Sequence, residues 1–269
     1  MEANKSLSAK LAVQMFTLRE FTKTASDLAE TLRRVREIGY TAVQLSAVGA
    51  MSGDDPKVDA KLARQMLDDY GLSCIATHRP WERLINQTHA EIEFHHILGC
   101  DYIAIGGISN DDYTYATYRK FVREAEELIG KLKPFGLRFG HHNHSREFFR
   151  PESGGVTLED ILIDEASPEL MLELDLYWIE HAGLNSVRIL ERCPGRVPVI
   201  HLKDKEVIKG ENDTRMAPIG EGTMDWPAIV EACEIAGVDW YCVEQDRCFR
   251  DPFDCVKSSF DYLSSLFLR

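Results

Sequence analysis

The sequence lacks a cysteine framework and any apolar run long enough to cross a membrane. Its seven cysteines are scattered without a CxxC pair, which predicts reduced thiols rather than a disulfide scaffold. No stretch of about 18 apolar residues is present, and the first residues contain no apolar run of signal-peptide length. We therefore expect a soluble, cytoplasmic protein with no membrane partner.

Basic residues are also in deficit. The chain has 31 Lys and Arg against 44 Asp and Glu, a net charge of −13 at pH 7. Nucleic-acid binding depends on Lys and Arg that displace counterions from phosphates, so no nucleic-acid partner is expected. The hydrophobic content of 44% excludes wholesale disorder. Because no Pro-, Gly- or Ser-rich linker divides the 269 residues, one domain over residues 1–269 is predicted.

Short apolar segments alternate with longer segments of helical period along the whole chain. This alternation is typical of repeated βα units and predicts an α/β fold of the (β/α)8 type, a TIM barrel. An open doubly wound sheet is the alternative, weakened because the first strand is followed by Gln14-Met-Phe-Thr-Leu-Arg19 and not by GxGxxG. The predicted strands are 11–15, 42–45, 72–76, 102–105, 137–140, 171–174, 197–200 and 240–243.

Helix signals lie between these segments. Asp225 and Asp251 stand next to Pro227 and Pro252 as predicted N-caps, and Gly237 marks a helix end. Two apolar stripes at helical spacing predict core-facing helices: Leu28, Leu32, Val35 and Ile38, and, in the last helix, Phe253, Val256, Phe260, Leu263 and Phe267.

Polar residues collect where four consecutive strands are predicted to end. The segment His141–Glu147 follows the fifth strand, Asp175 the sixth, His201 the seventh and Glu244 the eighth. In a parallel barrel the loops after the strands converge on one rim, where the chemistry is done. A single His or Asp there is usually a structural residue, but one ligand from each of four strands favours a divalent cation.

Other residues on the predicted rim carry two interpretations each. Gln14 and Gln44 either bind a polyol through hydrogen bonds or are satisfied barrel residues. Lys203 either faces the site, where a neighbouring cation would lower its pKa, or is a surface lysine paired with Asp204. Glu173 points into the barrel and is interpreted as structural.

The third strand is followed by His78 and Arg79, which are predicted to contact substrate oxygens and not the metal. The loop Pro218-Ile-Gly220-Glu221-Gly222 has the glycine content of a segment that can fold over a ligand, so Glu221 is a further candidate for substrate binding.

Taken in order, these segments resemble the xylose isomerase-like TIM barrels, in particular the sugar phosphate isomerase/epimerase superfamily, which also contains inosose dehydratase, tagatose-type epimerases and the endonuclease IV class. The resemblance covers essentially the whole chain. It depends on Val13-Gln-Met15, Phe139-Gly-His-His-Asn-His144 with Glu147-Phe148, Leu174-Asp-Leu-Tyr-Trp178, His201-Leu-Lys-Asp204, Pro218-Ile-Gly-Glu-Gly222 with Asp225-Trp226, and Val243-Glu-Gln-Asp246.

The family's metal quartet of Glu, Asp, His and Glu implies that His142, Asp175, His201 and Glu244 hold one divalent metal ion, Mn, Zn, Co, Mg or Fe. His142 stands where relatives have a glutamate that exchanges a proton with the substrate. The resemblance therefore implies Glu244 as one acid/base, with Lys203 or Glu147 in the missing role.

The implied activity is that of a metal-dependent isomerase or epimerase acting on a keto sugar, sugar phosphate or cyclitol through an enediolate. An inosose-type dehydratase uses the same chemistry when a β-hydroxyl leaves. An endonuclease IV-like phosphodiesterase and a non-catalytic sugar-binding barrel are less favoured alternatives. The expected partner is a small carbohydrate, and the oligomeric state, a homo-oligomer included, stays open.

Overall fold

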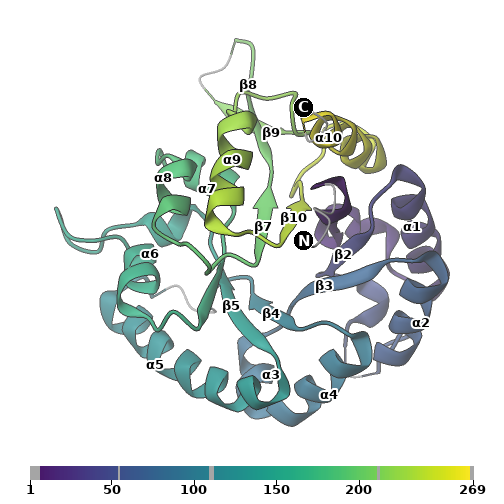
Figure 1. The fold of residues 1–269 in the computed structure, drawn as a ribbon, viewed down its shortest axis with the longest axis horizontal. Helices are drawn as coiled ribbons and strands as arrows, with labels where there is room; N and C mark the ends of the chain where they lie inside the picture. The colour runs from purple at the N-terminus through teal and green to yellow at the C-terminus, as the bar shows by residue number, and fades with distance from the viewer. Residues whose placement is uncertain (1–6, 54, 109–111, 211–212, 267–269) are drawn as a thin grey trace, which may run out of the picture.

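A computed structural model describes residues 7–53, 55–108, 112–210 and 213–266. Eight parallel strands form one sheet in the order β6-β5-β4-β3-β2-β1-β10-β7, with helices between them on the outside (Figure 1). This is the predicted TIM barrel. The sheet strands are β1 Leu11–Gln14, β2 Ala42–Leu45, β3 Ser73–His78, β4 Tyr102–Ile105, β5 Arg138–His142, β6 Leu170–Glu173, β7 Val199–Leu202 and β10 Trp240–Val243.

The helices follow the strands as the apolar stripes predict. Asp225 caps α9, and the helix ends at Gly237, whose φ of 78° is the left-handed conformation that glycine adopts without strain. Phe267 lies outside the described residues. The helices are α1 Ala25–Ile38, α2 Ala60–Tyr70, α3 Trp81–Asn86, α4 Thr88–Leu98, α5 Tyr115–Leu132, α6 Leu158–Asp160, α7 Leu176–His181, α8 Ser186–Glu191, α9 Trp226–Ala236 and α10 Pro252–Leu266.

The barrel interior is filled by small apolar side chains and one tyrosine. Ala12, Ala42 and Ala104 pack there with Tyr102. Gly140 of β5 is required beside that ring, because an added Cβ would lie 2.1 Å from the Tyr102 hydroxyl. Above this packed layer, Gln14, Gln44, Glu173 and His201 are buried at the carboxyl end of the strands, where the candidate site lies.

The barrel nearly closes between β6 and β7. There the Asp175 and His201 backbones form a parallel bridge, and the His201 N–H donates to the Leu174 carbonyl at 2.9 Å. Two predicted ligands therefore stand at the seam of the sheet.

Two features differ from the sequence-based expectation. β5 continues through His142, two residues beyond its predicted end, so the histidines belong to the strand and not to the loop after it. An unpredicted antiparallel hairpin, β8 Asp204–Val207 with β9 Thr214–Ala217, follows β7. No helix within the described ranges is both long and apolar enough to span a membrane.

Candidate metal centre

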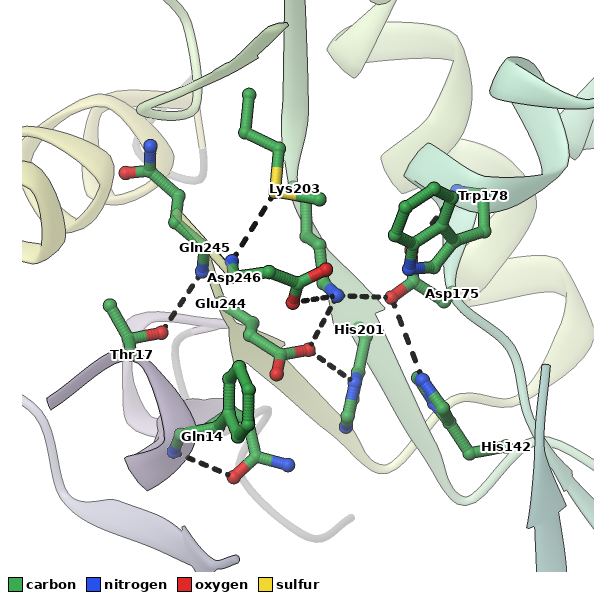
Figure 2. A network of polar contacts seen from close by, with 12 residues as sticks. Gln14, Thr17, His142, Asp175, Trp178, His201, Lys203, Glu244, Gln245 and Asp246 are labelled. Carbon is green, nitrogen blue, oxygen red and sulfur yellow. Dashed lines mark hydrogen bonds and ion pairs between the residues drawn. The ribbon is translucent and has the colours of Figure 1, made fainter. Parts of the chain in front are cut away.

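Four strand ends place the predicted metal ligands in one buried cluster. His142 ends β5, Asp175 follows β6, His201 lies in β7 and Glu244 follows β10. Alternate residues of a strand point to the same face, and the four side chains meet inside the rim (Figure 2). All four are at most 5% exposed.

His201 is held so that one ring nitrogen faces the carboxylates. Its Nδ1 lies 2.9 Å from Glu244 Oε2. Its Nε2 lies 2.7 Å from Gln44 Oε1, and Gln44 in turn donates from Nε2 to Glu173 Oε1 at 2.9 Å. This chain orients the imidazole through the nitrogen that does not face the cluster, as outer residues do for metal-binding histidines.

Asp175 is oriented in the same way. Its Oδ1 accepts from the Trp178 N–H at 3.2 Å, and its backbone is bound on both sides by the Asn143 amide. Oδ2 is left to face the cluster, where it lies 3.8 Å from His142 Nε2. The second predicted ligand therefore presents one oxygen to the cluster, where the Lys203 ammonium is its partner.

Lys203 lies at the centre of the carboxylates. Its Nζ is 2.8 Å from Asp175 Oδ2, 2.9 Å from Glu244 Oε2 and 2.7 Å from Asp246 Oδ1 (Figure 2). At 1% exposure it is not the surface lysine of the alternative interpretation. Asp204 instead accepts hydrogen bonds from the 220–226 segment.

Without a metal the pKa of Lys203 is raised, and the lowering expected beside a bound cation stays a prediction. Burial disfavours the ammonium, but the carboxylates of Asp175, Glu244 and Asp246 outweigh burial. For Glu244 burial is likewise outweighed, by Lys203 and His201, and its pKa is held well below the ordinary value.

Among the other three predicted ligands, the pKa is raised for His201 and Asp175 and lowered for His142. Burial opposes the charging of His201, yet Glu173 and Glu244 raise its pKa to about 9. Burial raises the pKa of Asp175 to about 6. Burial, with the charges of His201 and His144, lowers the pKa of His142 far below its ordinary value, which leaves a neutral imidazole ready to bind a metal.

A second group of ligand atoms adjoins the first. Glu173 Oε2 contacts His78 Nε2 and lies 3.5 Å from His142 Nδ1 and 3.4 Å from His201 Nε2. His78, predicted to bind substrate, thus stands among side chains able to hold a metal, beside His142 and His201. The sequence predicts that Glu173 points into the barrel, where it is interpreted as a structural residue. Glu173 is therefore missing from the candidate ligands that the sequence predicts.

The residues present fit a divalent cation. Asp175, His201 and Glu244 offer ligand atoms within 4.8 Å of one another, and His142 Nδ1 is buried without a hydrogen-bond partner. The carboxyl groups of Glu173, Asp175, Glu244 and Asp246 lie around the Lys203 ammonium and the His201 imidazole, which they share. A bound cation would add positive charge among these buried carboxylates.

Three predicted site residues are engaged elsewhere. The Arg79 guanidinium donates to both oxygens of Glu91, at 2.6 and 2.7 Å. Glu221 forms an ion pair with Arg250 and accepts from the Ser258 hydroxyl. Glu147 accepts hydrogen bonds at its carboxylate from Tyr118, Arg146 and the His144 N–H. The structure does not bring these side chains into the metal cluster.

Gln14 lies at the end of β1 beside the cluster. Its Oε1 accepts from the Phe16 N–H at 3.2 Å, and its Nε2 is buried without a partner. Both polar atoms of the Gln44 amide have partners, His201 and Glu173, whereas the amide nitrogen of Gln14 has none. Asp246 is a further site residue whose role the sequence did not predict.

The chain belongs to the xylose isomerase-like TIM barrel family, whose model matches residues 32–266. It is similar in fold to a sugar phosphate isomerase/epimerase from Parabacteroides distasonis, with 23% identity, coverage of 98% of this chain and 96% of that chain, and a TM-score of 0.76.

Two further solved structures share the fold. L-ribulose 3-epimerase is 15% identical, with coverage of 97% of this chain and 95% of that chain and a TM-score of 0.73. A probable 3-DHS dehydratase from Bacillus anthracis is 14% identical, with coverage of 95% and 98% and a TM-score of 0.70. No curated protein matches the chain.

Proposed function

We propose that the protein is a divalent-metal-dependent isomerase or epimerase of a keto sugar or cyclitol. The observation that carries the proposal is the convergence of four strand ends on one buried cluster. Asp175, His201 and Glu244 offer ligand atoms within 4.8 Å of one another, and His142 Nε2 lies 3.8 Å from Asp175 Oδ2. The names of the similar structures, which include an isomerase/epimerase and a 3-epimerase, agree with a small carbohydrate substrate.

The group formed by Asp175, His201 and Glu244, with His142 beside it, is the better metal position. At this position His201 would bind the metal through Nδ1 while its Nε2–H donates to Gln44 Oε1. This is the usual arrangement of a metal-binding histidine, whose second ring nitrogen donates to an outer acceptor. Binding through Nε2 to the Glu173 group would break the hydrogen bond to Gln44. We expect Asp175→Asn to lose the metal and Glu173→Gln to weaken it less.

The cation, when bound, supplies a Lewis acid that polarises a carbonyl and acidifies the neighbouring C–H. Glu244, ionised at neutral pH, accepts the proton from that carbon. Lys203 Nζ, 2.9 Å from Glu244 Oε2, can return a proton to the adjacent oxygen or carbon. Because the two groups are neighbours, they serve the same face of the substrate.

That adjacency also favours a second candidate, a dehydratase of the inosose type. An epimerase needs a second acid/base on the opposite face, and Glu147, the carboxylate implied for that role, is engaged by Tyr118 and Arg146. Removal of a β-hydroxyl needs only a base and an acid on one face, which Glu244 and Lys203 provide. One similar structure is a probable dehydratase.

The test is solvent deuterium exchange into ketoses and cyclitols with Mn²⁺ and with EDTA. We expect exchange that requires the metal and disappears in Glu244→Gln while the bound metal is retained. Loss of water from the substrate, without an epimer or isomer, points to the dehydratase, and exchange without any new product points to an untried substrate of the same class. Sugar binding without exchange indicates a binding barrel, and a DNA shift at physiological salt indicates the phosphodiesterase; either result overturns the proposal.

A further inference from the structure

A cavity of about 650 Å³ opens beside the metal cluster at the ends of β2 and β3. His78 and Thr77 form its inner wall, and α2 and α4 contribute residues such as Ala60 and Phe94 on its outer side. His78 also contacts Glu173 in the cluster, so the cavity and the candidate metal centre share one side chain. The cavity therefore begins one side chain away from the cluster, at His78, and the proposal below assumes that a ligand over the metal reaches it past this residue.

The cavity contains two arginines, but neither is a free anion site. Arg79 and Arg83 both bind the fully buried Glu91 carboxylate. That pairing, although burial opposes it, lowers the pKa of Glu91. The N-terminus of α2 is occupied as well, because the Asp59 carboxylate accepts from the Leu62 N–H at 2.8 Å. Each cationic feature of the wall already faces a carboxylate.

The rest of the lining suits a ring with an apolar face and a hydroxylated edge. Leu45, Val48 and Met51 supply apolar surface, and the Arg79 guanidinium lies 4.3 Å above the Phe94 ring. Polar atoms come from Ser52 and Gln87. The volume falls in the range of roughly 300–1,000 Å³ of ligand pockets, far more than a phosphoryl group occupies.

We propose that this cavity binds a second, uncharged sugar ring, so that the substrate is a keto sugar carrying a glycosyl group and not a monosaccharide or its phosphate. The inference rests on the proposed function, since it assumes that the first ring lies over the metal. Arg79 and Arg83 share the Glu91 carboxylate, and the Asp59 carboxylate also lines the cavity, so the two guanidinium groups are balanced by two carboxylates. A neutral ring fits such a wall, because it needs hydrogen bonds and apolar contacts and not a counter-charge.

The test uses matched ligands on the Mn²⁺-loaded protein. Fructose, fructose 6-phosphate and isomaltulose differ only in carrying a hydroxyl, a phosphate or a glucosyl group at one oxygen, and lactulose carries its second ring elsewhere. Binding is followed by calorimetry and turnover by deuterium exchange. We expect a keto disaccharide to exceed fructose about tenfold in kcat/KM or affinity.

The cavity itself is tested with Gln87→Trp, at the exposed residue before α4, and with Ser52→Trp, at a second exposed lining position. Gln65→Trp, at an exposed position of α2 that does not line the cavity, is the matched control. We expect each wall variant to lower the ratio of kcat/KM, or of affinity, for the disaccharide over fructose about tenfold. The control should keep this ratio.

Preference for fructose or its phosphate, or a ratio that the wall variants leave intact, overturns the inference while the proposed function stands. Disaccharide binding that Gln87→Trp abolishes, without any deuterium exchange, supports the cavity and removes the proposed activity. If none of the sugars binds and none exchanges deuterium, both the inference of a second ring and the proposed function fail.

Discussion

Lys203 determines how the carboxylates behave without metal. It is the shared partner of Asp175, Glu244 and Asp246, and it is buried. Lys203→Met would leave those carboxyl groups without a counter-charge, so we expect the EDTA-treated protein to lose about 3–5 kcal/mol of unfolding free energy. Mn²⁺ should recover part of that loss, because the cation replaces the missing charge. Urea unfolding with and without Mn²⁺ measures both effects.

The control for this experiment is Lys257→Met, which removes an exposed pair with Asp261 and should cost about 0–1 kcal/mol. If Lys203→Met behaves like Lys257→Met, the carboxylates do not depend on the buried ammonium. If Mn²⁺ recovers none of the unfolding free energy lost in Lys203→Met, the carboxylates around Lys203 do not bind the metal.

His201 gives the metal-free protein a defined pH dependence. Its pKa is raised to about 9 in the folded chain from an ordinary 6.5, mainly by Glu173 and Glu244 against the effect of burial. A raised histidine pKa stabilises the fold fully below pH 6.5, and this contribution is lost as the pH rises through 9. We expect a decrease on the order of 3 kcal/mol across that window in EDTA.

Urea unfolding between pH 6 and 9.5 measures the decrease, and His201→Gln should flatten the curve. Mn²⁺ affinity should change in the opposite direction, since the metal needs the neutral imidazole and its binding releases the proton. A stability curve that is equally steep in His201→Gln would assign the pH dependence to another group.

The segment 218–226 is fixed by a single buried carboxylate. Asp204, at the start of β8, accepts from the N–H groups of Gly220, Gly222 and Met224 and from the Trp226 indole. Gly222 allows this approach, because a Cβ there would lie 2.2 Å from Asp204 Oδ1 and 2.5 Å from the Lys205 carbonyl. The glycine predicted to give mobility instead permits tight packing.

Gly222→Ala should therefore loosen this segment. We expect a loss of roughly 1–3 kcal/mol as the hydrogen bonds to Asp204 lengthen, with faster amide hydrogen exchange at Gly220 and Met224. Gly130→Ala, in helix α5 with open space around the added methyl, is the control and should keep or raise stability. Unchanged exchange rates in Gly222→Ala would show that the segment does not depend on the close approach.

Hydrophobic runs were enough to predict the sheet. The strands 42–45, 102–105 and 240–243 match the structure, and the others shift by one or two residues, because buried parallel strands are apolar on both faces. β5 was ended too early because its last residues are histidines. The hairpin of β8 and β9 was missed because Lys205 and Glu206 carry no strand signal.

The metal ligands could be predicted because each follows its own strand, whereas their partners could not. Arg79, which follows β3, is bound by Glu91 of α4, and Glu221 is bound by Arg250 from a different loop. No local sequence pattern therefore shows that the candidates Arg79 and Glu221 already have partners. Glu173 was visible as an inward acid, but its contact with His78 depends on the curvature of the whole sheet.

The closure of the barrel and the candidate metal site coincide. β6 and β7 meet through the Asp175–His201 bridge, and both residues are proposed ligands. A cation bound there would tie the two strands together through their side chains. Metal binding at 100 times its Kd adds about 2.7 kcal/mol to the native state, which for a chain of this size raises Tm by about 5–10 °C.

We expect Mn²⁺ to produce this increase relative to EDTA and to slow hydrogen exchange most at the seam, at the His201 N–H bound to Leu174, and in the adjoining β7–β10 pair, at the Glu244 N–H bound to Leu202. Asp175→Asn should abolish both effects, and Glu147→Gln, outside the ligand cluster, should keep them. Protection spread evenly over the strand pairs on the far side of the barrel, β2 to β4, would mean that the metal stabilises the fold without closing it. In that case the metal position at the seam would have to be abandoned.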